Sequence, residues 1–473
     1  MERKREIYCL KDVPEEVVAV AFAKTSRSPE SIKDITKELT EEGSSKFHEK
    51  WVVGYGHSSV AEHAVLHIAL DNVSRFAVEN IESNRLASYT EKSTRYQIYD
   101  RSCYYIPEKF EAAGLKQLYI DTCNLLIDTY QEALPKVKEV VKNMYPMKPD
   151  EEQKAYEGRI LSKYVDVCRF LLPYSALANM GMTANARTME HAITKMLSSP
   201  VDEVQQIGKE VKIATLGVTP TLLKYANPSE YIVGTQQNLS RIAENFTTQI
   251  NKTDIECVEL VDRDDNAEEK FIAACLYKYS TQSYNDIYEF VKNMDKTQKI
   301  DVLDKILGTL SEHDRPVREL ELPYVTFDCI MDQGAWFDLK RNRMMTQIHQ
   351  KFTPDYGYAI PKLIEEAGMR EKYCFAIEKS AEAYREIYKV FPEEAAYILT
   401  NAHNRRMLMK MNLRELYYLI KLRSRSAGHF SYRRIALRMY ELAYQKYPAI
   451  MQYLQLKDIE KSSDVGNNNF IKF

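Results

Sequence analysis

The stretch HAVLHIALDNVSRFAVENIESNRLAS, residues 63–88, carries the pattern from which the fold can be predicted. Its first half is rich in β-branched and long apolar side chains, which predicts a strand. A short amphipathic segment follows and predicts a helix. After it comes Asn-Arg, at residues 84 and 85. The same outline returns in LPYVTFDCIMDQGAWFDLKRNRMMT, residues 322–346. We therefore expect one structural unit to be used twice in the chain.

Two further pairs of segments occur in the same order and support a duplication. VAFAKTSRSPESIKDI (20–35) matches AACLYKYSTQSYNDI (273–287), and each predicts an apolar helix ending in Lys-x-Ser. LLPYSALANMGMTANARTMEHAI (171–193) matches VFPEEAAYILTNAHNRRMLMKMNLRELYYLI (390–420). Each of these predicts a long helical stretch after a proline, with Asn at its centre.

These patterns predict an α+β fold made of two tandem repeats, each a small, mostly antiparallel sheet packed with long helices. We expect the first repeat to span residues 1–245 and the second to span 265–462. The remaining residues, 463–473, are expected to form a flexible tail.

Composition excludes several classes of protein. The 473 residues are too many for one ordinary core, and 45% hydrophobic with 28% charged residues is typical of globular proteins. A formal net charge of −3 argues against a nucleic-acid binder, so an anionic ligand must be held by a local arginine cluster. The charged N-terminus MERKREIYCL and the short apolar runs predict a cytoplasmic protein with no membrane partner.

The motifs of common metal and phosphate sites are absent from the sequence. Its eight cysteines are scattered without a CxxC pair, and its nine histidines include no HExxH. His57, Glu62 and His63 cluster in GYGHSSVAEH, residues 54–63, but no further ligand is spaced with them, and a helix start capped by Ser58 or Ser59 explains the segment equally well. We therefore predict reduced thiols and no metal site.

The segment SNRLASYTEKSTRY, residues 83–96, is unusually rich in hydrogen-bonding groups. Arg85 and Arg95 could each clamp a phosphate or carboxylate, while Ser88 and Ser93 both donate and accept. With Glu91 as an acceptor, this set fits a small ligand with a phosphate at one end and a hydrogen-bonding ring at the other, such as a nucleotide. A capping loop with ordinary surface charges is the alternative interpretation.

The motifs GHSSVAEH, SRFAVENIESNRLASYTEKSTRY, RFLLP and NAR, in this order, resemble the flavin-dependent thymidylate synthases. The signature of that family is Arg-His-Arg, seven residues and Ser, in a segment ending Ser-x-Arg-Tyr. Here Arg85 is followed by seven residues and Ser93, and then by Arg95 and Tyr96. The second half repeats the outline with KRNRMMTQIHQKFTPDYGYAIP and NLRELYYLIKLRSRSAGH, so the resemblance covers most of both halves.

The resemblance implies an enzyme that makes dTMP from dUMP. It implies FAD as cofactor, methylenetetrahydrofolate as carbon donor and NADPH as electron source. Because active sites of the family lie between subunits of a homotetramer, a tandem form implies a homodimer that acts as a pseudo-tetramer. One alternative is a catalytically degenerate, flavin- or nucleotide-binding paralogue with a regulatory or structural role. Another is a flavoprotein that acts on a different pyrimidine.

The site residues follow from the resemblance, position by position. The residues implied to bind dUMP are Arg85, Ser88, Glu91, Ser93, Arg95, Arg169 and Arg423, with Arg423 and Ser93 as the catalytic pair. The residues implied to contact FAD are His63, Asn185, Arg341, Asn342, Arg343 and Asn412.

Each half departs from the signature where the other half keeps it. In the first half, Ser83 and Asn84 stand in place of Arg-His, and Met196 replaces the late arginine that activates uracil. Methionine cannot stabilise negative charge on a uracil carbonyl. The second half keeps that arginine but has Lys351 and Thr353 in place of the Ser and Arg of the nucleotide segment. We therefore expect a composite site that combines groups of both halves.

Overall fold

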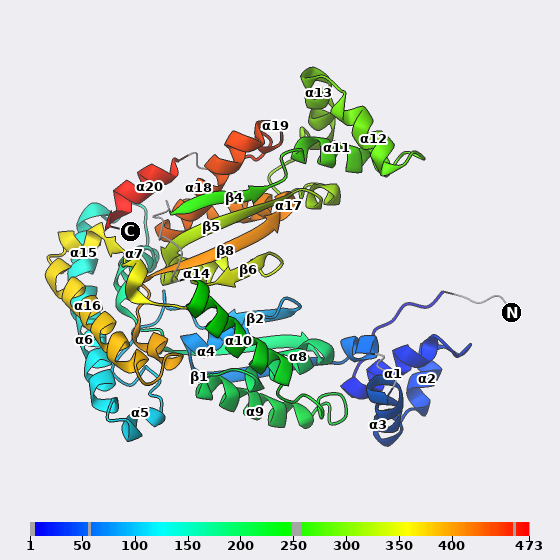
Figure 1. Cartoon of the computed structure of the whole chain (residues 1–473), viewed down its shortest axis with the longest axis horizontal. Coiled ribbons are helices and arrows are strands. Elements are labelled where there is room, and N and C mark those ends of the chain that lie inside the picture. The colour runs from blue at the N-terminus through cyan, green and yellow to red at the C-terminus, as the bar shows by residue number, and fades with distance from the viewer. Residues whose placement is uncertain (1–4, 55–57, 248–256, 457–459, 473) are drawn as a thin grey trace. The chain divides into compact units, whose positions relative to one another are not determined.

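The computed structural model describes residues 5–54, 58–247, 257–456 and 460–472 (Figure 1). The chain forms two compact units. Unit 1 consists of residues 1–93 and 175–252, and unit 2 of residues 94–174 and 253–473. The segment 94–174 of the first repeat thus packs with the second repeat, and the units divide the chain differently from the predicted domain boundaries at 245 and 265.

Figure 1 labels most of the helices and strands that follow. Unit 1 contains α1 (Glu15–Thr25), α2 (Ile32–Glu38), α3 (Glu41–His48), β1 (Val65–Ser74), α4 (Arg75–Ile81), β2 (Ala87–Glu91), β3 (Leu177–Asn185), α8 (Ala186–Leu197), α9 (Asp202–Leu216) and α10 (Glu230–Thr247). Unit 2 begins with α5 (Lys109–Ala112), α6 (Lys116–Met144) and α7 (Gln153–Cys168). It continues with β4 (Val258–Arg263), α11 (Ala267–Tyr277), α12 (Tyr284–Lys292), α13 (Lys296–Leu307), β5 (Tyr324–Asp332), α14 (Gln333–Leu339), β6 (Thr346–His349), β7 (Ile360–Pro361), α15 (Lys362–Glu366), α16 (Arg370–Tyr388), β8 (Asn404–Asn412), α17 (Leu413–Arg423), α18 (Phe430–Lys446), α19 (Pro448–Met451), α20 (Ser462–Asn469) and β9 (Phe470–Lys472).

The two main sheets share one topology, and this confirms the predicted α+β fold of tandem repeats. The sheet of unit 1 has the order β1-β3-β2, and that of unit 2 has the order β4-β5-β8-β6. All pairs are antiparallel. Strands β5, β8 and β6 therefore repeat β1, β3 and β2, and β4 is added at the edge.

The first helices of the repeats also agree in their hydrogen bonds. Helices α1 and α11 have 11 residues each. The next helix is capped by Ser31 in one repeat and by Ser283 in the other, each accepting an N–H at 3.2 Å. Ahead of these caps, Ser28 and Ser280 each accept the N–H of the residue two positions later. The structure therefore aligns Ser280 with Ser28. Ser28 lies two residues after Ser26, the serine of Lys-x-Ser in the first repeat.

The central strand of each sheet corrects a prediction. The stretches after Pro173 and Pro392 were expected to be long helices with Asn at their centres, but each forms a nine-residue strand that ends at the Asn, followed by a helix. In β3, every second side chain from Ala178 to Ala184 is buried. This period of two is that of a strand, so the helical prediction was wrong.

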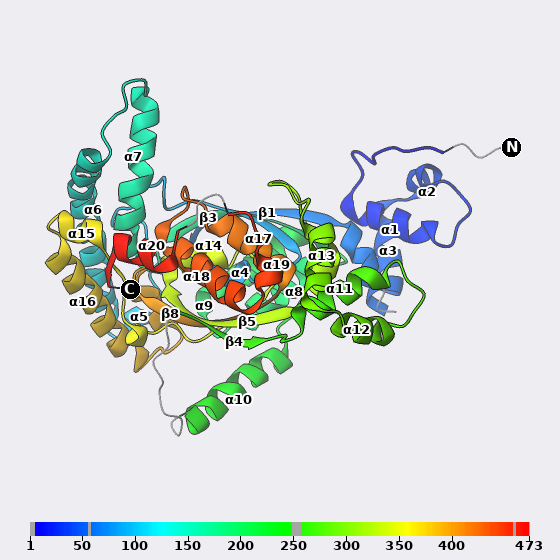
Figure 2. The ribbon, with the colours of Figure 1, turned by 90° about the horizontal axis from the view of Figure 1, so that it is seen from above.

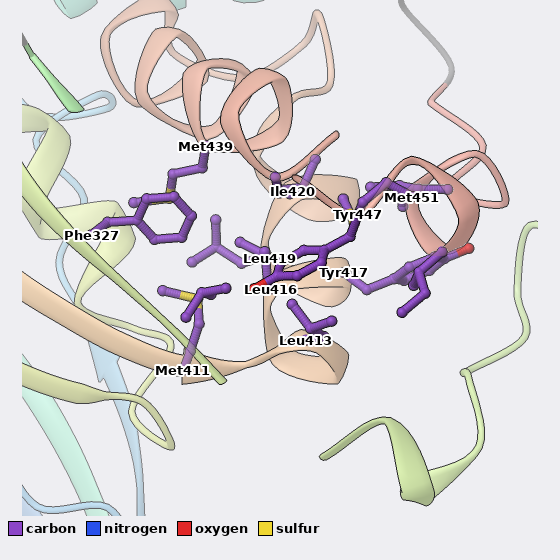
Figure 3. Close-up of a cluster of buried hydrophobic side chains, with 14 of the residues drawn as sticks. Phe327, Met411, Leu413, Leu416, Tyr417, Leu419, Ile420, Met439, Tyr447 and Met451 are labelled. Atoms are coloured by element: carbon purple, nitrogen blue, oxygen red, sulfur yellow. The ribbon is translucent and has the colours of Figure 1, made fainter. Parts of the chain in front are cut away.

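One core of unit 2 fills the space between its sheet and helices α17 to α19 (Figure 3). The sheet contributes Phe327 and Met411, and α18 contributes Met439. The other labelled members of the core are Leu413, Leu416, Tyr417, Leu419, Ile420, Tyr447 and Met451. Each of these side chains is at most 4% exposed, and burying an apolar side chain this completely stabilises the fold by about 1.5–3 kcal/mol.

Helix α6 attaches the segment 94–174 to unit 2. Figures 1 and 2 both show α6 beside α15 and α16. Glu132 of α6 accepts a hydrogen bond from Lys372 of α16 at 2.7 Å, and the rings of Phe110 and Phe391 stack 5.5 Å apart. At the end of the segment, the N–H of Tyr174 donates to the carbonyl of Leu399 at 2.7 Å.

The C-terminal residues, predicted to be a flexible tail, form α20 and β9 instead. Strand β9 pairs antiparallel with β7. Phe470 is 3% exposed and its ring meets that of Phe430 at 5.0 Å, so this apolar side chain anchors the segment. Across the residues that the structure describes, each helix is too short or too polar to cross a bilayer.

Candidate functional site

In unit 2, two arginines of the first repeat meet one buried carboxylate. Arg95 donates to both oxygens of Asp166, from Nε at 2.7 Å and from Nη2 at 2.5 Å. Arg169 lies three residues after Asp166, and its Nε is 3.6 Å from the same carboxylate. Nη1 of Arg169 donates to Thr94 Oγ1 at 3.2 Å. Burial alone would raise the pKa of Asp166, but the charges of Arg169, His429 and Arg95 hold it below its ordinary value.

The second repeat adds a histidine to this cluster. His429 caps α18, where its Nδ1 accepts the N–H of Ser431 at 3.2 Å. Its Nε2 therefore carries the proton and donates to the carbonyl of Asp166 at 3.2 Å. Burial, and then the positive charge of Arg169, lower the pKa of His429 to about 4, so the ring is neutral at pH 7.

A second carboxylate gathers two arginines of the second repeat. Arg423, the last residue of α17, places Nη1 3.4 Å from Oδ1 of Asp338, and Nη1 of Arg341 lies 3.8 Å from the same atom. The guanidinium of Arg423 also stacks over the ring of Tyr432, 5.3 Å from its centre. Tyr432 contributes to the electrostatic environment of Arg95, and Asp338 to that of His429.

Groups of both repeats are therefore joined within unit 2. Four arginines, Arg95, Arg169, Arg341 and Arg423, gather around the carboxylates of Asp166 and Asp338. Arg169 is 8% exposed, and within the described residues its buried Nη2 has no hydrogen-bond partner. A guanidinium held this way presents donors that fit a phosphate oxygen.

The predicted flavin residues of unit 2 take part in local structure. Asn412 ends β8 and its Oδ1 caps α17, accepting the N–H of Glu415 at 2.8 Å. Asn342 is 8% exposed and donates from Nδ2 to the carbonyl of Leu339 at 3.0 Å, closing α14. Arg343 is half-buried on the loop before β6.

In unit 1, the predicted residues lie along β2 and at the end of β3. Arg85 and Ser88 are exposed, and Ser93 is half-buried after the strand. Glu91 is taken up by the fold, because its buried carboxylate lies 3.1 Å from Nη2 of Arg75. Asn185 ends β3 and caps α8 through the N–H of Thr188 at 2.9 Å.

His63 lies at the end of a 3-10 turn, Ser58–His63, and is exposed. Its ring meets that of Phe22 edge-on at 5.0 Å, beside a cavity of about 600 Å³. His57 lies outside the described residues. Among the residues that are described, no three metal-binding side chains come together.

Sequence reasoning missed several residues that organise these clusters. Met196, in place of the late arginine, is core at 3% exposed, but its neighbour Lys195 donates to Ser83 Oγ at 2.5 Å and lies 3.4 Å from Asn84 Oδ1. A cation thus reaches the loop where the signature has Arg-His. Asp166 could have been found from its position three residues before Arg169, a spacing that brings two side chains together on a helix.

Comparisons with known proteins agree with the repeat architecture. The model of the family described as thymidylate synthase complementing protein matches residues 10–221 and 259–449. A UPF0159 protein of Chlamydia muridarum is 30% identical over 97% of this chain and 93% of its own length. A flavin-dependent thymidylate synthase of Clostridium tetani is 28% identical over 46% of this chain and 83% of its own length. A solved UMP/dUMP methylase of Streptomyces cacaoi, bound with 5-Br dUMP, matches 43% of this chain and 95% of its own with 14% identity and a TM-score of 0.32.

Proposed function

Because this chain belongs to the thymidylate synthase complementing protein family, we propose that it methylates dUMP to dTMP. The carbon comes from methylenetetrahydrofolate, and the reducing electrons come from NADPH through FAD. The observation that carries the proposal is the cluster around Asp166, where Arg95 and Arg169 of the first repeat meet His429 of the second. The relationship to a flavin-dependent thymidylate synthase of Clostridium tetani supports the choice of reaction.

Arg95 and Arg169 are proposed to bind the phosphate of dUMP. Asp166 holds the guanidinium of Arg95 in a fixed plane, and the buried Nη2 of Arg169 supplies a donor that the fold has not used. Positioning by such charged, preoriented donors fixes where the uracil ring lies. In unit 1, Arg85, Ser88, Glu91 and Ser93 remain predicted nucleotide contacts, and the carboxylate of Glu91 also forms an ion pair with Arg75.

Arg423 is proposed to stabilise negative charge on a uracil carbonyl during the reaction. Its Nη1 is 3.4 Å from Asp338, and stacking on Tyr432 fixes the plane of the guanidinium. A donor that needs no reorganisation stabilises developing charge most effectively. Ser93 stays the second catalytic residue of the proposal.

Bound FAD would supply hydride transfer to the pyrimidine. The residues proposed to hold it are His63, Asn185, Arg341, Asn342, Arg343 and Asn412. The donor set fits, because among the described residues the caps made by Asn185 and Asn412 use only Oδ1, and each amide keeps its NH₂ group for a ligand. NADPH and the folate are proposed as co-substrates, and a cytoplasmic homodimer as the assembly.

The test is an absorption titration of the purified chain with FAD and then with dUMP, followed by assay of dTMP. The proposal expects a flavin band that shifts with dUMP and dTMP formation that depends on methylenetetrahydrofolate and NADPH. Arg169→Met should shift the response to dUMP to concentrations about tenfold higher or more. The matched control is Arg101→Ala, which removes an equally two-pronged but exposed ion pair with Asp128. Absence of any flavin response in the wild-type chain would contradict the proposal.

A second candidate function is binding of flavin or nucleotide without turnover. It is favoured by Asn84 and Asn342, which replace the histidine of the family signature. Each donates from Nδ2 to the carbonyl three residues before it, at 3.0 Å, so each closes a helix instead of serving a ligand through that group. This candidate expects the flavin shift with dUMP but no dTMP.

A further inference from the structure

A second cavity lies in unit 2, between α18 and the N-terminal end of α20. Its volume is about 540 Å³, within the range of pockets that hold small organic ligands. Figures 1 and 2 both show α20 beside α18. The family match ends at residue 449, so α20 belongs to a segment beyond it. The residues described above as the candidate nucleotide and flavin site are absent from the lining of this cavity.

The charged lining of the cavity is predominantly basic. Arg434 and Arg438 come from α18, Lys461 directly precedes α20, and Glu441 is the single carboxylate among the lining residues that the structure describes. Glu441 is already engaged, because its two oxygens accept the N–H and the hydroxyl of Ser462, each at 2.7 Å, and Nη1 of Arg438 donates to its Oε2 at 3.4 Å. Three cations against one carboxylate leave the described lining with an excess of positive charge.

Arg434 is the most deeply buried cation in the described lining of the cavity. The residue is 3% exposed, and its guanidinium lies over the ring of Phe470, 5.4 Å from the centre. Burial lowers the pKa of Arg434, while the nearby charge of Asp332 raises it. A planar guanidinium fixed by an aromatic ring is a geometry that suits recognition of phosphate.

We propose that this cavity binds a small phosphorylated organic molecule. Arg434, Arg438 and Lys461 would pair with the phosphate oxygens, and the hydroxyl of Ser463 would add a hydrogen bond. Inorganic phosphate alone would leave most of the 540 Å³ to water, so an organic phosphate fits the volume better. The proposal does not depend on dUMP methylation, since the cavity shares no residue with that site.

The test uses the full-length chain and isothermal titration with inorganic pyrophosphate and with ATP. The wild-type chain is expected to bind both. Lys461→Ala, an exposed position, and Arg438→Ala are each expected to weaken binding by about tenfold or more, because each removes a charged hydrogen bond. The matched control is Lys446→Ala, because Lys446 is an exposed lysine at the end of α18, the helix that carries Arg438. This variant should leave the affinity unchanged.

Two further arms locate the site. Cys257 also lines the cavity, so pyrophosphate should slow its alkylation by iodoacetamide in the wild-type chain but not in Lys461→Ala. Arg95→Ala should weaken binding of dUMP and leave pyrophosphate binding unchanged, which separates this cavity from the nucleotide site. The proposal is overturned if pyrophosphate and ATP do not bind, if Lys461→Ala and Arg438→Ala bind them as the wild type does, or if Lys446→Ala weakens binding equally.

Discussion

Asn185 and Asn412 occupy the same position in the two repeats. Each is the last residue of the central strand of its sheet, and each caps the next helix through Oδ1, at 2.9 Å to Thr188 N and at 2.8 Å to Glu415 N. The structural role of these side chains therefore coexists with their predicted role as flavin contacts.

Asn185→Asp and Asn412→Asp separate these two roles. Aspartate caps a helix about as well as asparagine, so the free energy of unfolding should change by less than about 0.5 kcal/mol. The substitution replaces the NH₂ donor by a charged oxygen, so FAD affinity should fall by about tenfold if the amide contacts the flavin. Urea unfolding and FAD fluorescence titration measure the two quantities, and Asn→Ala at the same sites should lower both.

Removal of Arg95 is expected to cost more stability than removal of Arg101. Both arginines form two-pronged ion pairs, with Asp166 and Asp128 respectively, but the Asp166 side chain is 8% exposed and that of Asp128 is 45% exposed. Arg95→Ala leaves a buried carboxylate without its main partner and should destabilise by about 3 kcal/mol. Arg101→Ala should cost less than about 1 kcal/mol. Equal losses in chemical denaturation would show that Asp166 is not the buried centre described above.

The lowered pKa of His429 makes the stability of the fold depend on pH. Its pKa in the folded chain is about 4, below the ordinary 6.5, so the unfolded chain binds more protons between these values. Stability should therefore fall as the pH drops from about 6.5 to about 4, with a contribution from His429 on the order of 3 kcal/mol. His403, with a pKa lowered by burial to about 3, adds to the same slope.

His429→Asn keeps a capping side chain but cannot titrate, so the slope of unfolding free energy against pH should become shallower in this window. His313→Asn, at an exposed histidine, is the control and should leave the slope unchanged. An unaltered slope in His429→Asn would rule out the neutral, buried histidine.

Each repeat has a buried hydrogen bond at the residue that caps the helix after its first matching strand, but donor and acceptor are exchanged between the repeats. Ser74 caps α4 and donates to Glu203 of α9 at 2.5 Å, whereas Asp332 caps α14 and accepts from Ser431 of α18. Glu203→Ala leaves the N–H and hydroxyl of Ser74 without this acceptor and should destabilise by about 2–3 kcal/mol. Glu210→Ala, exposed on the same helix, should stay within about 0.5 kcal/mol in the same urea experiment.

The repeat architecture could be predicted because strand and helix patterns recur in order. The central strands could not be recognised so easily, since their buried faces are built from alanine and methionine, such as Ala178, Met180, Met407 and Met409. These residues favour helices as readily as strands when read one by one. Only the period of two along each strand, which ends at Asn185 or Asn412, identifies them.

The candidate site was only partly visible in the sequence. The arginines stood out by their spacing, and Asp166 could have been found from its position three residues before Arg169, but nothing in the sequence distinguishes Asp338 from a surface carboxylate. The packing of residues 94–174 with the second repeat depends on contacts between distant segments, such as Lys372 with Glu132, which no local pattern encodes. Phe470 likewise orders a C-terminal segment whose composition predicts a loose tail.

The proposed nucleotide site draws on both repeats. Its test is isothermal titration of dUMP into the FAD-loaded chain, with Arg169→Met for the first repeat, Arg423→Met for the second and Arg101→Ala as control. We predict that Arg169→Met and Arg423→Met each weaken dUMP binding by about tenfold or more, while the control binds as the wild type does. Unchanged dUMP affinity in either arginine variant, with the fold intact by circular dichroism, would contradict the composite site.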